Sequence, residues 1–413
     1  DGITVVIDSG YARVPRFDPA RGMARLETVA VSRAGADQRR GRAGRTAPGV
    51  CYRLWPAAAS GALPTFDAPE ITQTDLAGLA LELAAWGVSD PASLAWPTPP
   101  PAPALDRARQ LLRDLQALSA DDRITDHGRR MARFPTHPRL AHMILRGDEE
   151  GLGPLACDIA ALLGERDILG FPAGSREADL GLRLQALTGE GRPAAPPRKP
   201  ALKAARSSAR QWRRLLKNDA AACDIGDAGR LLAMAYPDRI ARRRDGTQPR
   251  YLMSGGGEAQ LASEDRLASS PYLVIAELGG SGKPPTVFQA SPLDEGEIET
   301  LFAPQIRDED RLGWDMRSRS VTARRERRLG HLVLGSRPLK DVPADRLGEA
   351  VGLHALMTLC LAWERKWAGF NHHLRRTQAL LQRTGRVDVN FAESLERAGR
   401  LAMEANQPKR AWS

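Results

Sequence analysis

The sequence is poor in cysteine and has no long apolar run. Its four cysteines, Cys51, Cys157, Cys223 and Cys360, lie far apart and show no paired spacing. This pattern argues against a disulfide scaffold or a zinc site and indicates a reducing compartment. No apolar run approaches the ~20 residues that are needed to span a bilayer. We therefore expect a cytoplasmic protein without membrane contact and without metal-ligating residues of its own.

Two motifs of nucleotide-hydrolysing motors are also missing. The sequence contains no complete phosphate loop, Gly-x-x-x-x-Gly-Lys-Ser/Thr, and no acidic Asp-Glu-x-His box. The nearest match to a phosphate loop, residues 279–283, has Glu277 where the first glycine belongs and Pro284 in place of the hydroxyl residue. We interpret this match as a turn between strands. Because the phosphates and Mg²⁺ lack a complete binding site, we expect the chain alone to show no ATP hydrolysis.

Arginine, in contrast, is abundant. The 413 residues include 53 Arg against 7 Lys, and the formal net charge is +10. This balance favours a polyanionic partner such as nucleic acid, although a generally arginine-rich composition explains the charge equally well. The length predicts about three domains or more, and a hydrophobic content of 42% is enough for ordinary cores.

The most informative segment is Gln-Arg-Arg-Gly-Arg-Ala-Gly-Arg at residues 38–45, called the octet below. In a helix, Gln38, Arg42 and Arg45 would lie at i, i+4 and i+7 within one stripe. Gly41 and Gly44 would lie on another side and allow close backbone approach. An amide and two guanidinium groups suit a polyphosphate, and arginine at a γ-phosphate stabilises phosphoryl transfer. A generic solvated arginine face is the alternative, which the Gly-Arg-Ala-Gly-Arg spacing disfavours.

The octet resembles motif VI of the DEAH-box ATP-dependent helicases of superfamily 2. Residues 4–10 are similar to the strand that closes motif V, and residues 11–28 to the β-hairpin that the family places between the two motifs. The stretches that resemble the HrpB-like branch of this family are 13–19, 38–45, 49–55, 89–91, 134–140 and 236–242. The resemblance covers roughly residues 1–345. It implies a C-terminal fragment whose first motor domain, and most of the second, lie upstream.

The resemblance also implies roles for particular residues. The catalytic residues would be Arg42 and Arg45, which reach the γ-phosphate, and Gln38, which helps to place the phosphate or the attacking water. Arg39, Asp1 and Gly2 would contribute to cofactor binding. The cofactor would be ATP with Mg²⁺, bound mainly by residues upstream of this sequence, and the partner would be single-stranded RNA or another nucleic acid.

Contacts with nucleic acid are expected from the hairpin and from a later β-rich region. Short strand-like runs at 231–236, 250–253, 273–278, 286–290 and 320–325 predict a small β-barrel. Its position resembles the oligonucleotide-binding (OB) fold of the family. The expected contact residues are Arg13, Arg16, Arg242, Arg243, Arg244, Arg324 and Arg325. A solvated surface is the alternative for either basic cluster.

The expected fold class is multidomain α/β plus α plus β. Its parts are the end of a RecA-like helicase lobe (1–60), a winged-helix-like domain (61–136), a helical ratchet-like bundle (137–226), an OB-like β-barrel (227–345) and an unassigned C-terminal helical segment (346–413). Apolar periodicity predicts helices at 75–88, 105–118, 138–163, 179–187 and 207–216 and a wing or turn at 124–134. His372 and His373 are adjacent, so their side chains diverge and do not form a metal pair.

The expected function is part of an ATP-dependent RNA helicase that couples ATP hydrolysis to movement on, or unwinding of, nucleic acid. The alternative is a nucleic-acid-binding module without catalysis of its own, since the phosphate loop and acidic box are absent.

Overall fold

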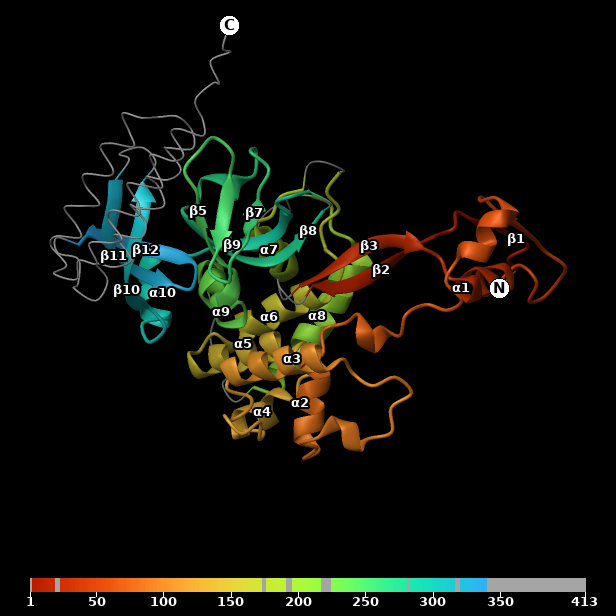
Figure 1. Cartoon of the computed structure of the whole chain (residues 1–413), viewed down its shortest axis with the longest axis horizontal. Coiled ribbons are helices and arrows are strands. Elements are labelled where there is room, and N and C mark those ends of the chain that lie inside the picture. The colour runs from red at the N-terminus through yellow and green to blue at the C-terminus, as the bar shows by residue number, and fades with distance from the viewer. Residues whose placement is uncertain are drawn as a thin grey trace, which may run out of the picture. The chain divides into compact units, whose positions relative to one another are not determined.

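The computed structural model describes residues 2–18, 23–172, 176–190, 195–216, 224–280, 282–315 and 320–339. The chain divides into two compact units, at Ile298 and Glu299 (Figure 1). The segment expected at 346–413, with its histidine pair, lies outside the described residues, and so does Asp1. No helix within the described ranges has the length and hydropathy to cross a membrane. The same ranges contain no group of three or more metal-ligating side chains.

The N-terminal part of the first unit is a small α/β arrangement. Strand β1 (Val5–Asp8) pairs in parallel with β4 (Val50–Arg53), and helix α1 (Arg33–Arg40) lies between them in sequence. Strands β2 (Tyr11–Asp18) and β3 (Met23–Ala30) form an antiparallel hairpin that leaves this part as a long ribbon (Figure 1). The predicted strand before the hairpin and the hairpin itself are therefore confirmed.

Helices follow from residue 77 onward. They are α2 (Ala77–Ala85), α3 (Ala102–Asp114), α4 (Asp126–Met131), α5 (Pro138–Glu149), α6 (Gly153–Gly164), α7 (Leu180–Thr188), α8 (Lys199–Arg213) and α9 (Ala228–Ala235). Short 3-10 turns occur at Ala57–Ala62, Glu70–Thr72, Pro91–Ser93, Ile225–Asp227, Pro237–Arg239 and Arg266–Ser269. The five helices predicted from periodicity are present, although the segment at 138–163 is two helices.

Two predictions in this region are wrong. Residues 126–131 form helix α4 rather than a wing, because the Thr125 hydroxyl caps the helix by accepting from the Gly128 amide at 2.9 Å. Residues 231–236, expected as a strand, belong mostly to helix α9. Leu231 and Leu232 are both fully buried, and a short run of continuous apolar residues does not distinguish a buried helix from a buried strand.

A closed five-stranded barrel follows the helices. Its strands are β5 (Ile240–Arg243), β6 (Arg250–Met253), β7 (Glu258–Gln260), β8 (Tyr272–Gly279) and β9 (Thr286–Pro292), in the order β5-β6-β7-β9-β8. Tyr251, Leu273 and Ile275 are fully buried in its core. The phosphate-loop-like segment lies between the end of β8 and the start of β9, which confirms that it is a turn between strands.

The barrel is smaller than predicted. After helix α10 (Glu295–Leu301), strands β10 (Arg307–Asp315), β11 (Ser320–Leu329) and β12 (Leu332–Pro338) form their own antiparallel sheet, in the order β10-β11-β12. This sheet belongs to the second unit. The prediction of one barrel over 227–345 is therefore wrong in extent, because the closed barrel lies within residues 240–292.

Candidate functional site

Helix α1 carries the first part of the octet. The helix begins after Ser32, whose hydroxyl accepts from the Gly35 amide at 2.9 Å, and it ends at Arg40. The chain continues in turns: the Arg42 amide donates to the Arg39 carbonyl, and the Ala43 amide to the Arg40 carbonyl, both at 3.1 Å. The octet is therefore not helical throughout, so the stripe that a helix would form from Gln38, Arg42 and Arg45 is not present. Glycines at 41 and 44 lower helix propensity there, so the chain turns instead.

The side chains of Gln38, Arg42 and Arg45 are all exposed. Ala43, which is only 3% exposed, lies between the two arginines and anchors the turn in the core. The described contacts include no hydrogen bond or ion pair for the guanidinium groups of Arg42 and Arg45. Both cations are therefore available to an anion from outside this chain.

Near the octet, Gly49 is a position where no side chain fits. A Cβ atom there would lie 1.9 Å from the Ala43 carbonyl oxygen, so only glycine lets strand β4 start beside the octet turn. At Gly44 a Cβ would meet nothing within 4 Å, and at Gly41 its nearest contact would be an ordinary 3.5 Å. The predicted close approach at these two glycines is therefore not found.

Arg39 lies apart from the other cations of the octet. Its guanidinium group donates to Asp8 Oδ1 at 2.8 Å and to the Tyr11 carbonyl at 3.1 Å. The Asp8 side chain is fully buried, and its Oδ1 also accepts from the Gly10 amide at 3.0 Å. Arg39 therefore binds the end of β1 and the first residue of the hairpin.

A neighbouring carboxylate pairs with two further arginines. Asp37 lies 2.7 Å from the Arg53 guanidinium and 3.5 Å from that of Arg40. The hydrogen bond from Arg53 holds the pKa of the exposed Asp37 below its usual value, so this acid stays ionised. Of the arginines in the octet, Arg42 and Arg45 thus remain without an internal counter-charge within the described region.

The arginines expected to contact nucleic acid differ in whether they already have partners within the chain. On the hairpin, Arg13 is exposed, while Arg16 pairs with Glu27 at 3.1 Å. On the barrel, Arg242 lies over the Tyr272 ring, Arg243 donates to the Ala268 carbonyl, and Arg244 pairs with Glu258. In the second unit, Arg325 makes a bidentate pair with Asp310 at 2.6 and 2.8 Å, and Arg324 donates to Ser336 at 3.4 Å.

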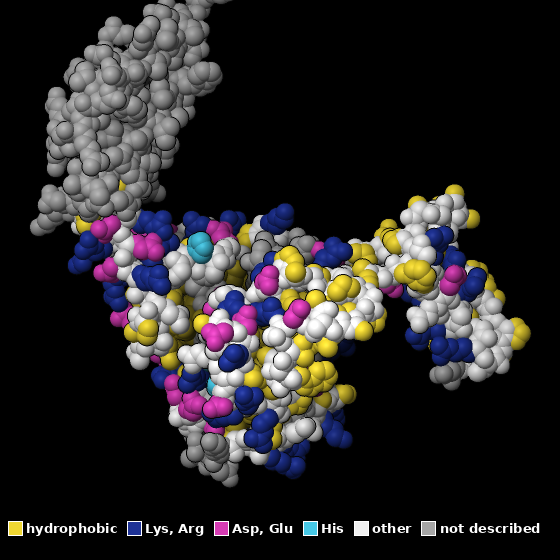
Figure 2. Space-filling view, turned by 60° about the horizontal axis from the view of Figure 1, so that its bottom comes forward, with side chains coloured by type: hydrophobic (Ala, Val, Ile, Leu, Met, Phe, Trp, Pro, Cys, Tyr) yellow, Lys and Arg dark blue, Asp and Glu magenta, His cyan; other side chains and the backbone are white. Residues whose placement is uncertain are grey.

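The structure therefore does not bring the two predicted clusters onto one barrel. Figure 2 shows Lys and Arg side chains interspersed with acidic ones on the face that is drawn, rather than collected in one basic patch. Many of the arginines thus lie close to a carboxylate.

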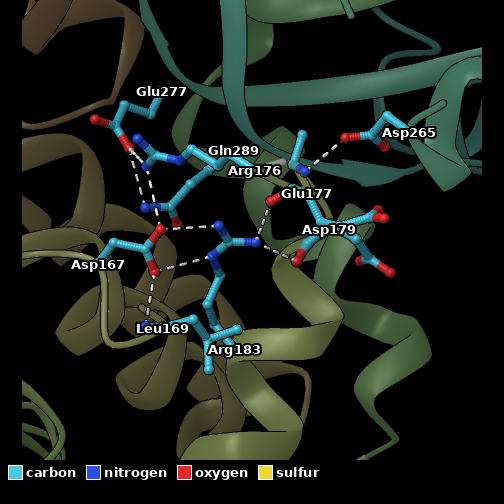
Figure 3. A network of polar contacts seen from close by, with 10 residues as sticks. Asp167, Leu169, Arg176, Glu177, Asp179, Arg183, Asp265, Glu277 and Gln289 are labelled. Carbon is cyan, nitrogen blue, oxygen red and sulfur yellow. Dashed lines mark hydrogen bonds and ion pairs between the residues drawn. The ribbon is translucent and has the colours of Figure 1, made fainter. Parts of the chain in front are cut away.

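The sequence did not indicate a polar network that joins α7 to the barrel strands β8 and β9 (Figure 3). Asp167 accepts from the buried Arg183 at 2.9 Å and lies 3.3 Å from Arg176, which also pairs with Glu277 at 3.2 Å. Gln289 donates to Glu277 at 3.0 Å. These partners are up to about a hundred residues apart in sequence, so no local pattern could have indicated them.

Two cavities, of about 460 and 400 Å³, adjoin this network and share Asp167, Arg176 and Arg198 in their walls. The Arg176 guanidinium also lies 4.5 Å from the centre of the Phe288 ring. Within the described structure, Arg176 Nε and Gln289 Oε1 are buried and have no hydrogen-bond partner. The junction is therefore polar and incompletely satisfied by this chain alone.

Two of the stretches that carried the family resemblance, 134–140 and 236–242, contact each other. Arg139 makes a bidentate pair with Asp238 at 2.6 and 3.0 Å and donates to the Ala235 carbonyl at 3.0 Å. The guanidinium groups of Arg139 and Arg239 lie 5.5 and 4.4 Å from the centre of the Tyr236 ring. These contacts connect helix α5 to the segment that leads into strand β5 of the barrel.

Known proteins are similar to this chain in sequence and in fold. The sequence model of the connector region of ATP-dependent RNA helicase HrpB matches residues 305–339, which hold the β10–β12 sheet. The model of the winged-helix helicase-associated domain (HA2) matches residues 108–136.

Individual relatives agree with these family models. ATP-dependent RNA helicase HrpB of Escherichia coli K12 is 33% identical over 353 residues, which cover 85% of this chain and 41% of that protein. The splicing helicase prp22 of Schizosaccharomyces pombe is 38% identical over 43% of this chain and 16% of its own length. A crystal structure of E. coli HrpB, titled a DExH-box NTPase, matches with a TM-score of 0.68 and 30% identity over 99% of this chain and 51% of that one.

The chain thus spans about two fifths to one half of the HrpB proteins that it matches. The resemblance inferred from the octet is confirmed: this chain is HrpB-like and corresponds to the C-terminal region of the DEAH-box helicases.

Proposed function

We propose that this chain is part of an ATP-dependent RNA helicase, which couples ATP hydrolysis to movement on RNA or to its unwinding. The observation that carries the proposal is the octet, which presents Gln38 and the uncompensated guanidinium groups of Arg42 and Arg45 to solvent beside helix α1. The matched relatives are named as ATP-dependent RNA helicases, which favours this function over a binding module without catalysis.

In this proposal Arg42 and Arg45 contact the γ-phosphate, and Gln38 orients the phosphate or the attacking water. Two unpaired arginines suit a polyphosphate because each fork binds phosphate oxygens bidentately and keeps its charge. ATP with Mg²⁺ would be held mainly by residues from the part of the relatives' length that this chain does not span. Asp1 and Gly2 would lie near the sugar of the nucleotide.

The parallel strands β1 and β4 support assignment of residues 1–60 to a RecA-like lobe. Register pairs Val5 with Val50 and Ile7 with Tyr52, and all four side chains are at least half exposed. Parallel sheets are normally covered on both faces, so this apolar face fits the interior of a larger α/β sheet. We further propose a winged-helix-like domain at 61–136, a ratchet-like bundle at 137–226 and an OB-like fold for the closed barrel.

We also propose that single-stranded RNA contacts the hairpin and the barrel. Arg13 is the strongest candidate because its exposed guanidinium has no acidic partner among the described residues. The contacts proposed for Arg16, Arg242, Arg243, Arg244, Arg324 and Arg325 require these side chains to exchange or share their internal partners. A cytoplasmic location stays a prediction.

The proposal is tested by ATP hydrolysis of the full-length protein with and without single-stranded RNA. We expect hydrolysis that RNA stimulates and that Arg42→Ala abolishes. The matched control is Arg40→Ala, which removes an exposed arginine already paired with Asp37. Absence of hydrolysis in the wild-type protein, or equal loss in both variants, would contradict the proposal.

A further inference from the structure

The octet and the hairpin meet at one side chain. The Arg39 guanidinium group bridges Asp8 Oδ1 at the end of β1 and the Tyr11 carbonyl at the start of β2. The two ends of the hairpin close at the same place, because the Val31 amide donates to the Gly10 carbonyl at 2.9 Å. Gly10 itself has a φ of +80° and is held by its amide hydrogen bond to Asp8. Asp8 therefore fixes the base of the hairpin, and Arg39 fixes the base to α1.

Arg39 also contacts the turn that follows α1 and carries Arg42 and Arg45. The Arg39 carbonyl accepts from the Arg42 amide at 3.1 Å, so the backbone of Arg42 cannot shift far without disturbing the backbone of Arg39. The side chain of Arg39 thus contacts the base of the hairpin, whereas its backbone carbonyl contacts Arg42, the residue proposed to bind the γ-phosphate.

From this geometry we propose that Arg39 is a positioning residue. It couples the turn that carries Arg42 and Arg45 to the β2–β3 hairpin, so that ATP hydrolysis drives the unwinding of RNA. The inference rests on the proposed function and deepens it. It gives Arg39 a different role from the nucleotide contact that the family resemblance implied.

The buried carboxylate of Asp8 explains why a cation is needed at position 39. Asp8 is 2% exposed, and its Oδ2 has no hydrogen-bond partner within the described structure. Among the described contacts, Arg39 is the cation that compensates this charge. A buried carboxylate without its partner is strongly unfavourable, so the pair holds a single geometry. Arg39 Nη1 donates both hydrogen bonds, to Asp8 Oδ1 and to the Tyr11 carbonyl. Lysine would keep the charge, but its ammonium group lies on a shorter and more flexible side chain, so we expect it to hold both contacts less well.

The hairpin extends from the Arg39–Asp8 contact toward the barrel. Its eight paired positions run from Tyr11 and Ala30 at the base to Asp18 and Met23. Strand β3 also lies beside β8 of the barrel. A small movement at the base is therefore carried along a hydrogen-bonded ribbon to the region where RNA contact is proposed.

The test compares Arg39→Ala, Arg39→Lys and Asp8→Asn with Arg40→Ala in the full-length protein. Arg40 is the matched control, since it is the next residue of α1 and its exposed ion pair with Asp37 does not touch the hairpin. For each variant we would measure RNA-stimulated ATP hydrolysis, the KM for ATP, and base pairs unwound per ATP hydrolysed. Amide hydrogen exchange of β2 and β3 would be followed with and without a non-hydrolysable ATP analogue.

We expect Arg39→Ala and Asp8→Asn to keep hydrolysis and its KM near wild type while unwinding per ATP falls by at least about fivefold, the lower range of coupling between sites. Nucleotide-dependent exchange in the hairpin should disappear in both, and Arg39→Lys should be intermediate. Arg40→Ala should match the wild type. Arg39→Lys keeps a positive charge beside Asp8 and serves as the test if the alanine variant does not fold.

Three results would overturn the inference. Unwinding per ATP could stay constant in all Arg39 and Asp8 variants, or hydrolysis and unwinding could fall in proportion, or the KM for ATP could rise with unwinding per ATP unchanged. The last result would place Arg39 on the nucleotide. Failure of the proposed function looks different, because the wild-type protein itself would then show no RNA-stimulated hydrolysis.

Discussion

The contact between Arg139 and Asp238 allows a quantitative prediction about how the helices hold the barrel. Asp238→Ala removes both carboxylate oxygens that bind the Arg139 guanidinium, at 2.6 and 3.0 Å. The Arg139 side chain is 8% exposed and that of Asp238 is 33% exposed. After the substitution the buried guanidinium keeps the Ala235 carbonyl and the Tyr236 ring as neighbours, but it has lost its counter-charge.

The magnitude follows from this burial. Removing one partner of a fully buried pair costs about 3–5 kcal/mol. Because Asp238 is one third exposed, water screens part of the loss, and we expect a decrease of about 2–3 kcal/mol in the free energy of unfolding. The first unit runs from Asp1 to Ile298. With an unfolding entropy of about 2.1 cal/mol/K per residue, this decrease corresponds to a fall in Tm of about 3–5 °C.

Differential scanning calorimetry and urea unfolding would measure this change. The control is Arg130→Ala, which breaks an ion pair with Glu149 at 3.1 Å whose side chains are 32% and 40% exposed. An exposed pair contributes only about 0–1 kcal/mol, so the control should unfold near the wild-type temperature. Equal destabilisation by both substitutions would refute the argument that burial makes the Arg139 pair different.

Three further predictions concern pH, catalysis and RNA. Burial lowers the pKa of His127 to about 4 and that of His142 to about 3, below the unfolded value of 6.5. Their neutral forms therefore stabilise the fold fully above pH 6.5, and this stability is lost as pH falls through about 4 for His127 and about 3 for His142. His142→Phe should shift the acid-unfolding midpoint, measured by near-UV circular dichroism, to lower pH, and an unchanged midpoint would refute this. The 413-residue chain alone should hydrolyse no ATP above background in a phosphate-release assay, because it lacks the phosphate loop, and RNA-stimulated hydrolysis would show this expectation to be wrong. It should bind single-stranded RNA weakly through residues 228–330, with a log–log salt slope of about −0.7 per phosphate contact in fluorescence anisotropy, and a slope near zero or no binding at ~50 mM salt would exclude such contacts.

Local patterns account for the parts of the fold that the sequence predicted. Residues 75–88 repeat apolar side chains at helical spacing, and α2 lies within them. The hairpin expected at 11–28 has strand-like residues on both sides of Asp18, Pro19 and Gly22, and β2 and β3 pair as expected. In both cases the signal lies within about twenty residues, so one segment carries all the information that its structure needs.

The failures have equally physical causes. Strand-like runs do not state which partner they pair with, so the strand at 320–325 was assigned to the barrel although β11 pairs with β10 and β12. The octet has the spacing of a helix, but its two glycines end α1 at Arg40. The same exposed residues were nevertheless singled out, because their chemical types rather than their helical geometry indicated phosphate binding.

Contacts between distant segments could not be inferred. Asp167 and Glu277 share Arg176, yet helices α7 to α9 and strands β5 to β7 separate them in sequence. Arg39 was placed with the nucleotide because its neighbours in sequence were. Its partner Asp8 lies 31 residues away, and only the packing of α1 against β1 brings the two together.

The most direct test of the proposed function is the Arg45→Lys substitution in the full-length protein, measured as RNA-stimulated turnover of ATP. Lysine keeps the charge but loses the planar fork, and the transition state of phosphoryl transfer spreads negative charge over three oxygens. Removal of such an arginine typically costs about 10³–10⁵ in turnover, so with partial rescue by lysine we expect a fall of at least ~10² in kcat. RNA affinity without nucleotide should change little. Turnover near the wild-type value would contradict the claim that this octet acts on the nucleotide.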